Sequence, residues 1–156
     1  EEANHITRGA AGSEASAMIF GEYFPDPGGK PLKEADHARV SHLNALFAEF
    51  LGTLMLALVV FGFTARHNKS GPGPMTPIAI GIALTTIISV FAPITQAGLN
   101  PARDLAPRIF SAIAGWGNMP FTVNGTGWLT VYIIAPCLGA LCGAFLANQL
   151  FSSKED

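Results

Sequence analysis

The chain has 156 residues, 49% of them hydrophobic, and only 20 are charged: 9 Lys or Arg against 11 Asp or Glu. Six of these charges fall in residues 43–151, a much lower density than the one quarter of a typical soluble domain. This composition argues against a water-soluble globular fold, and a net charge of −2 without a basic run argues against a nucleic-acid partner.

The first 42 residues are polar and irregular, and they hold eleven of the charges. They begin without an initiator Met or an apolar signal region. We therefore expect the chain to be a fragment or a processed piece of a longer protein.

Three apolar runs are each long enough to cross a hydrocarbon core about 30 Å thick, which takes about 20 helical residues. They cover residues 43–63, 77–98 and 128–151. A loop with two Gly-Pro pairs separates the first two runs, which predicts a helical hairpin.

A shorter helix is predicted over residues 101–114. Asn100 offers an N-cap and Pro101 suits the first helical position, whereas Gly115 and Gly117 end the segment. About 14 helical residues rise only about 21 Å, which fits a re-entrant half-helix. The sequence therefore predicts an all-α membrane protein with three transmembrane helices and one half-helix.

Small residues recur every four positions on two predicted helices, which favours close helix packing. The two stripes are Ala135, Gly139, Gly143 and Ala147 in the last span, and Gly81, Thr85 and Ser89 in the second.

The start of the half-helix carries the strongest chemical signal. An Arg at membrane depth is costly and marks a path or a site, and Arg103 lies on the same helix face as Asn100. Arg103 offers fixed charge and several donors, and the positive end of the helix dipole disfavours cations. These features predict a filter for neutral solutes that form hydrogen bonds. In the alternative, the half-helix has an ordinary capped start, and Arg103 and Arg108 extend to lipid head groups.

The run Asn100-Pro101-Ala102-Arg103 follows a span, and Asp104, Arg108 and Gly115-Trp116-Gly117 come after it. This pattern resembles the second half of the major intrinsic proteins, and within them the glycerol facilitator branch, the aquaglyceroporins. The resemblance covers essentially the whole chain. It implies an external (extracellular or periplasmic) loop over residues 1–42, the C-terminal half of an inverted-repeat channel over 43–151, and a cytoplasmic tail over 152–156.

The resemblance also implies a function. The whole protein would be a passive channel in the plasma or inner membrane for glycerol, urea, water or similar solutes, and it would exclude ions and protons. It would need no cofactor and no metal ion. A homotetramer is implied, as is a missing N-terminal half that completes each pore.

The same resemblance assigns roles to individual residues. Glu49 would be a buried acid that supports the irregular backbone before the half-helix, although a solvent-facing carboxyl is the alternative. The other assignments are a constriction of Arg103, Ile88 and Ala97, pore carbonyls from Gln96, Ala97, Gly98 and Leu99, a pore motif of Asn100, Pro101 and Ala102, and structural support from Asp104.

Two positions depart from the glycerol facilitator pattern. Ala97 stands where that branch usually has an aromatic residue, and Ile88 stands where it usually has Gly. An Ile and Ala pair resembles filters that pass uncharged metalloid acids or urea, so a metalloid-acid channel is an alternative.

Two other classes of protein were weighed. A membrane enzyme would use Arg103, Asp104 and a His, but the four His residues fall in or beside loops without a metal-pair spacing, and no nucleophile motif occurs. A non-conducting membrane subunit would explain the small-residue stripes but not an Arg beside Asn100. We therefore expect a channel and no enzyme.

Overall fold

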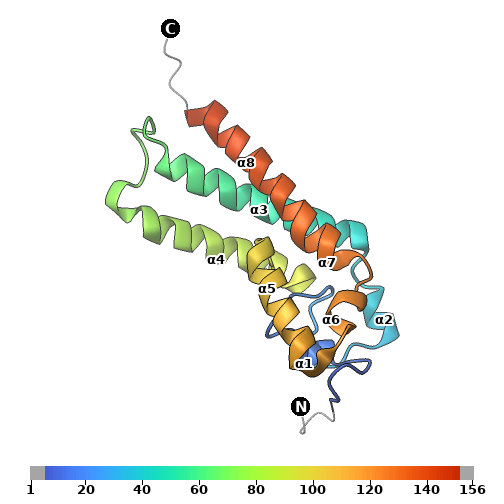
Figure 1. The fold of residues 1–156 in the computed structure, drawn as a ribbon. Coiled ribbons are helices and arrows are strands. Elements are labelled where there is room, and N and C mark those ends of the chain that lie inside the picture. The colour runs from blue at the N-terminus through green and yellow to red at the C-terminus, as the bar shows by residue number, and fades with distance from the viewer. Residues whose placement is uncertain (1–5, 152–156) are drawn as a thin grey trace.

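The computed structural model describes residues 6–151, and these form a helical bundle with the N-terminal segment folded against one end (Figure 1). Residues 1–5 of the predicted loop and the predicted tail over 152–156 lie outside the described residues. No strand occurs within residues 6–151. The elements in chain order are α1 (Glu14–Ala17), α2 (Glu34–His37), α3 (His42–Thr64), η2 (Gly73–Met75), α4 (Thr76–Thr95), α5 (Pro101–Ser111), η3 (Ala112–Trp116), α6 (Met119–Thr122), α7 (Gly127–Leu129), η4 (Thr130–Ile134) and α8 (Ala135–Phe151).

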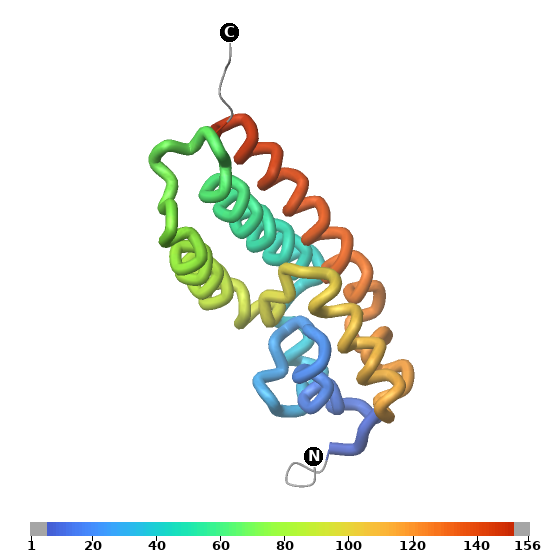
Figure 2. Tube along the Cα trace, turned by 60° about the vertical axis from the view of Figure 1, so that its left-hand side comes forward, coloured from blue at the N-terminus to red at the C-terminus, as the bar shows by residue number. Residues whose placement is uncertain are grey.

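Three continuous helical stretches are long and apolar enough to cross a membrane. They run over His42–Thr64, Gly73–Thr95 and Gly127–Phe151. Figure 2 shows α3 between α4 and α8, and α3 packs against both. These stretches confirm the predicted all-α membrane fold.

The predicted small-residue stripe of α8 lies against α3, and all four of its members are buried. A Cβ atom on Gly139 would lie 2.3 Å from the carbonyl oxygen of Phe50, and one on Gly143 would lie 2.3 Å from that of Leu54. The two backbones therefore approach as closely as small residues permit, which confirms the packing role of this stripe.

The stripe on α4 has no such contact in the described part of the chain. A Cβ atom on Gly81 would meet nothing within 4 Å. Thr85 and Ser89 are exposed and donate to carbonyls of their own helix. The packing role of this stripe stays a prediction.

The second span ends earlier than the sequence predicted. α4 stops at Thr95, whereas the apolar run continues to residue 98. Gln96, Ala97 and Leu99 have positive φ angles of 63°, 52° and 55°, and a right-handed helix cannot continue through left-handed backbone. We call residues 96–99 the connecting stretch.

The half-helix begins where the sequence predicts it. The side chain of Asn100 accepts hydrogen bonds from the backbone N–H groups of Ala102, at 2.9 Å, and Arg103, at 3.4 Å. α5 itself ends at Ser111, three residues before the predicted end, because the chain continues as the π-helical turn η3. Gly115 then turns the backbone with a φ of 111°.

The N-terminal segment, residues 6–41, packs beside α5 and α6 at one end of the bundle (Figures 1 and 2). The indole N–H of Trp116 donates to the carbonyl of Ser13 and the hydroxyl of Ser16. Ala17 and Tyr23 form a buried cluster with Trp116 and Met119. This predicted loop therefore has its own packed core, which places its residues 21–24 against the half-helix.

The close contact of α3 with α8 gives a first testable prediction. Gly139→Ala should lower the free energy of unfolding by about 1–3 kcal/mol, because the new methyl group overlaps a backbone carbonyl that cannot move freely. Thermal unfolding of the purified protein in detergent, followed by circular dichroism, measures this change. Gly81→Ala is the matched control and should leave stability unchanged or slightly raised, since Ala is the better helix former. Equal effects of the two substitutions would contradict the packing role.

Candidate functional site

The connecting stretch lies between α4 and α5 and cannot rely on helical hydrogen bonds. Its three left-handed residues have side chains, and each such residue costs about 1–3 kcal/mol in backbone strain. Ala97 and Leu99 are buried, so water does not satisfy the backbone here. Protein groups must therefore hold this conformation.

Glu49 of α3 supplies most of these groups. Its Oε1 accepts from the Thr95 hydroxyl at 2.6 Å and from the Gly98 N–H at 2.8 Å, and its Oε2 accepts from the Leu99 N–H at 2.6 Å. The carboxylate is fully buried and does not face solvent. Both of its oxygens are thus occupied by the end of α4 and the connecting stretch.

Two further side chains hold the same backbone. Thr53 of α3 donates to the carbonyl of Leu99 at 3.2 Å, and Tyr132 of η4 donates to the carbonyl of Thr95 at 3.1 Å. A carbonyl has two lone pairs, so the bond from Thr53 leaves one acceptor site on the predicted pore carbonyl of Leu99.

Arg103 lies beside this backbone at the start of α5. Its Nη1 donates to the carboxylate of Glu22 and approaches the carbonyl oxygens of Ala97, at 3.5 Å, and Gly98, at 3.4 Å. The side chain is 54% exposed. The structure therefore brings together three predicted site residues, and it places guanidinium donors next to backbone acceptors.

Ile88 is not placed against this group. Its neighbour Ile87 is 3% exposed and packs against Ala97 and Leu99, whereas Ile88 is 39% exposed. Successive residues of a helix point about 100° apart. The role of Ile88 in the constriction stays a prediction.

Asp104 and Arg108 form a buried ion pair behind the start of α5. Arg108 donates to both carboxylate oxygens of Asp104, at 2.7 Å and 2.9 Å, and also to the carbonyls of Glu22 and Pro120. Arg108 is 1% exposed. The alternative in which Arg108 extends to lipid head groups is therefore wrong, because all of its donors point into the protein.

The N-terminal segment contributes residues that the sequence did not single out. The backbone N–H of Glu22 donates to Asp104 at 2.8 Å, and that of Tyr23 donates to the side chain of Gln96 at 2.8 Å. Glu22 also pairs with Arg103. Its only sequence signal was a single acid between Gly21 and an aromatic pair, in a segment with many other charges.

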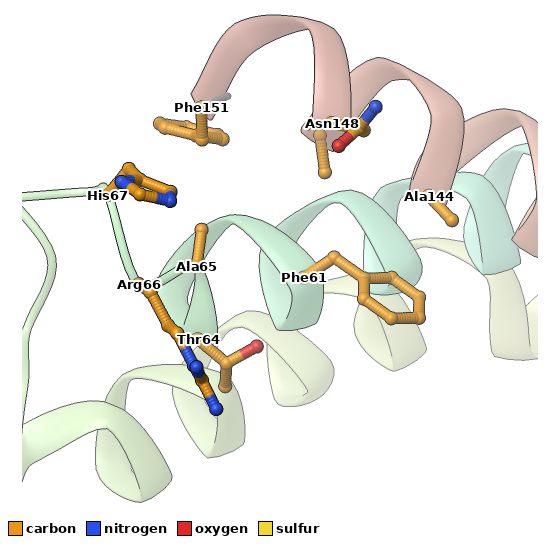
Figure 3. A pocket seen from close by; sticks show the side chains of 9 residues that line it. Phe61, Thr64, Ala65, Arg66, His67, Ala144, Asn148 and Phe151 are labelled. Carbon is orange, nitrogen blue, oxygen red and sulfur yellow. The ribbon is translucent and has the colours of Figure 1, made fainter. Parts of the chain in front are cut away.

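A pocket at the far end of α3 and α8 contains none of these residues. Figure 3 shows His67, which follows α3, beside Phe151 of α8, whereas the side chain of Arg66 points away from α8. Within residues 6–151, no three side chains of His, Cys, Asp or Glu are grouped to hold a metal ion. His5 lies outside the described residues. The polar site at Arg103 is therefore the candidate functional site.

Comparison with known proteins agrees with this geometry. Residues 5–147 match the family described as Major intrinsic protein. The chain is 31% identical over 151 residues to a glycerol uptake facilitator protein of Escherichia coli K12. The aligned region covers 96% of the chain and 50% of that relative. It is 34% identical over 145 residues to one from Pseudomonas aeruginosa, covering 92% of the chain and 48% of the relative.

A fungal relative gives a similar result. The chain is 37% identical over 117 residues to Aquaporin-7-2 of Laccaria bicolor. The aligned region covers 75% of the chain and 35% of that protein. The chain thus spans about half the length of the glycerol uptake facilitators that it matches. From the extent of the family match, the chain belongs to the major intrinsic protein family.

Proposed function

We propose that the chain is the C-terminal half of a passive channel for small neutral solutes that excludes ions and protons. The observation that carries this proposal is the position of Arg103. Its guanidinium lies beside the carbonyls of Ala97 and Gly98 at the N-terminal end of a half-helix. Relatives named glycerol uptake facilitator proteins support the same conclusion.

The arrangement can replace the hydration of a neutral solute. A hydroxyl or amide group of the solute donates to a carbonyl and accepts from the guanidinium, so both its donor and its acceptor are satisfied. A cation meets the fixed charge of Arg103 and the positive end of the α5 dipole, which oppose its passage. Selection by charge follows from these two groups.

The complete pore is proposed to need an N-terminal half and to assemble as a homotetramer in the plasma or inner membrane. The relatives are about twice as long as the chain. α4 is the least buried of the three spans, and large apolar side chains cover its outer face. The N-terminal half of the channel, a neighbouring subunit or lipid would cover this face of α4. No cofactor is needed for passive flux.

The solute follows from the size of the side chains near Arg103. Ala97 offers little apolar surface to a carbon chain, whereas glycerol gains from packing along one. We therefore propose urea and undissociated metalloid acids as candidate solutes in addition to glycerol.

Arg103→Ala should open the filter to ions. Loss of one fixed charge, worth about 4 kcal/mol at close range in a protein environment, should raise proton and cation leak at least about tenfold and weaken discrimination among neutral solutes. Stopped-flow and ion-leak measurements on vesicles with the full-length protein that carries this chain test this. Arg39→Ala, at an exposed site, is the control and should change neither property. Unchanged leak and unchanged selectivity in Arg103→Ala would refute the filter.

Glu49→Gln should damage folding and flux together. The substitution removes charge-assisted acceptors, worth about 1.5–3 kcal/mol each, and can turn an amide donor toward a backbone N–H. We expect a lower yield of folded protein and a lower solute flux in the same vesicles. Glu34→Gln makes the same chemical change at an exposed position and should behave as the native protein. Normal yield and flux in Glu49→Gln would mean that other groups hold the connecting stretch.

Ala97→Phe combined with Ile88→Gly should raise the flux of glycerol relative to urea severalfold. Phe would add an apolar surface beside the donors of Arg103, and Gly would remove the stiff branched side chain that is predicted to narrow the constriction. Flux ratios in vesicles of the full-length protein measure the change. Ile82→Gly alone, at an exposed position of α4, is the control for loss of an Ile on this helix. A ratio that stays constant or falls would remove both residues from the constriction.

A further inference from the structure

Glu22 occupies a fixed position beside the proposed filter. It is 6% exposed although it belongs to the N-terminal segment. Its backbone N–H donates to Asp104, its carbonyl accepts from Arg108, and its side-chain Oε1 accepts from Arg103. Three polar side chains of α5 therefore hold this single residue.

The second carboxylate oxygen of Glu22 is unusual. Oε2 is buried and has no hydrogen-bond partner among residues 6–151. A buried polar atom without a partner is costly. Asp104 lies next to Glu22, since it accepts the hydrogen bond from the Glu22 backbone N–H at 2.8 Å. A second negative charge so close opposes the ionised form of the Glu22 side chain.

A proton on Glu22 resolves this arrangement. Both oxygens of Asp104 already accept hydrogen bonds, two from Arg108 and one from the Glu22 backbone. The proton therefore belongs on Glu22, on the buried oxygen Oε2 that accepts no hydrogen bond. Its source is bulk water, and it returns there when Glu22 ionises.

We propose that Glu22 is a specificity-determining residue of the filter, which holds the Arg103 guanidinium through Oε1 and sets the net charge at the constriction through a proton on Oε2. This inference rests on the proposed role of Arg103 as the filter. With Glu22 ionised, the two negative charges of Glu22 and Asp104 balance the two positive charges of the arginines at positions 103 and 108. With Glu22 protonated, the same group carries one net positive charge.

The surroundings of Glu22 place this change near neutral pH. Burial raises the pKa of Glu22 to about 8, Arg103 opposes the rise, and the hydrogen bond with Asp104 adds to it. Glu22 lies before α3, outside the spanning helices. The titratable and charged groups that face it are Arg103, Asp104 and Arg108 of α5, Tyr23 of its own segment and Tyr132 of η4.

The direction of the pH effect follows from these contacts. Above about pH 8 the ionised carboxylate holds Arg103 by a charge-assisted hydrogen bond, so the guanidinium stays beside the carbonyls of Ala97 and Gly98. At lower pH the guanidinium, which stays charged, donates to a neutral carboxyl group; this bond is weaker than the ion pair, and the guanidinium moves toward the lumen. Solute flux should therefore rise as pH rises through about 8.

The test uses the full-length protein in vesicles, with urea as the probe solute. Between about pH 6 and about pH 10 we expect the native flux to rise about fivefold, which corresponds to a gain of about 1 kcal/mol when the acceptor of the Arg103 hydrogen bond becomes ionised. Glu22→Gln keeps an acceptor but cannot ionise, so its flux should not depend on pH. Glu14→Gln alters a buried carboxyl of the same segment that bonds to the Leu32 N–H, and it should keep the native profile.

Infrared spectra of the same samples report the protonation of Glu22 independently of the flux measurement. The native protein should show a protonated carboxyl band that disappears as pH rises through about 8, and Glu22→Gln should lack it. A band that survives in Glu22→Gln, or native flux independent of pH, would overturn the role of Glu22 alone. Absence of flux at every pH would instead overturn the proposed channel function, and the filter role of Glu22 with it.

Discussion

The buried carboxylate of Glu49 is the interaction on which the rest of the site depends. α4 must end inside the bundle and α5 must begin there, and the residues between them adopt left-handed backbone at a cost of about 1–3 kcal/mol each. Glu49 offsets this cost because it accepts hydrogen bonds from Gly98 and Leu99 and from the hydroxyl of Thr95. The same conformation brings the carbonyls of Ala97 and Gly98 within reach of Arg103.

The half-helix is fixed from its other side by the N-terminal segment. Arg108 joins Asp104 to the carbonyls of Glu22 and Pro120, which belong to segments far apart in the sequence. A buried ion pair of this kind is weak evidence for added stability, since the desolvation of two charges offsets their attraction. Its effect here is positional: it fixes the segment that presents Glu22 to Arg103.

Sequence reasoning found the features that leave a local pattern. Asn100 and Pro101 predict the start of α5 because cap chemistry is local, and the small-residue stripe predicts close packing of α8, although not which helix it packs against. The end of α4 at Thr95 was missed, because an apolar run does not reveal the sign of φ. Glu22 was missed because its partners lie about 80 residues away. The burial of Arg108 likewise depends on tertiary contacts that no local pattern encodes.

In the proposed channel, the charges around Arg103 explain how a filter for neutral solutes can coexist with several ionised groups. Arg108 and Asp104 satisfy each other out of contact with solvent, so they contribute little net field at the constriction. The field that a passing ion meets is then set by Arg103, by the α5 dipole and by Glu22. Of these three, only Glu22 can change its charge near neutral pH, because an arginine stays protonated and a helix dipole is fixed. The selectivity of such a site is therefore governed by a residue of the N-terminal segment as well as by the half-helix that carries the motif.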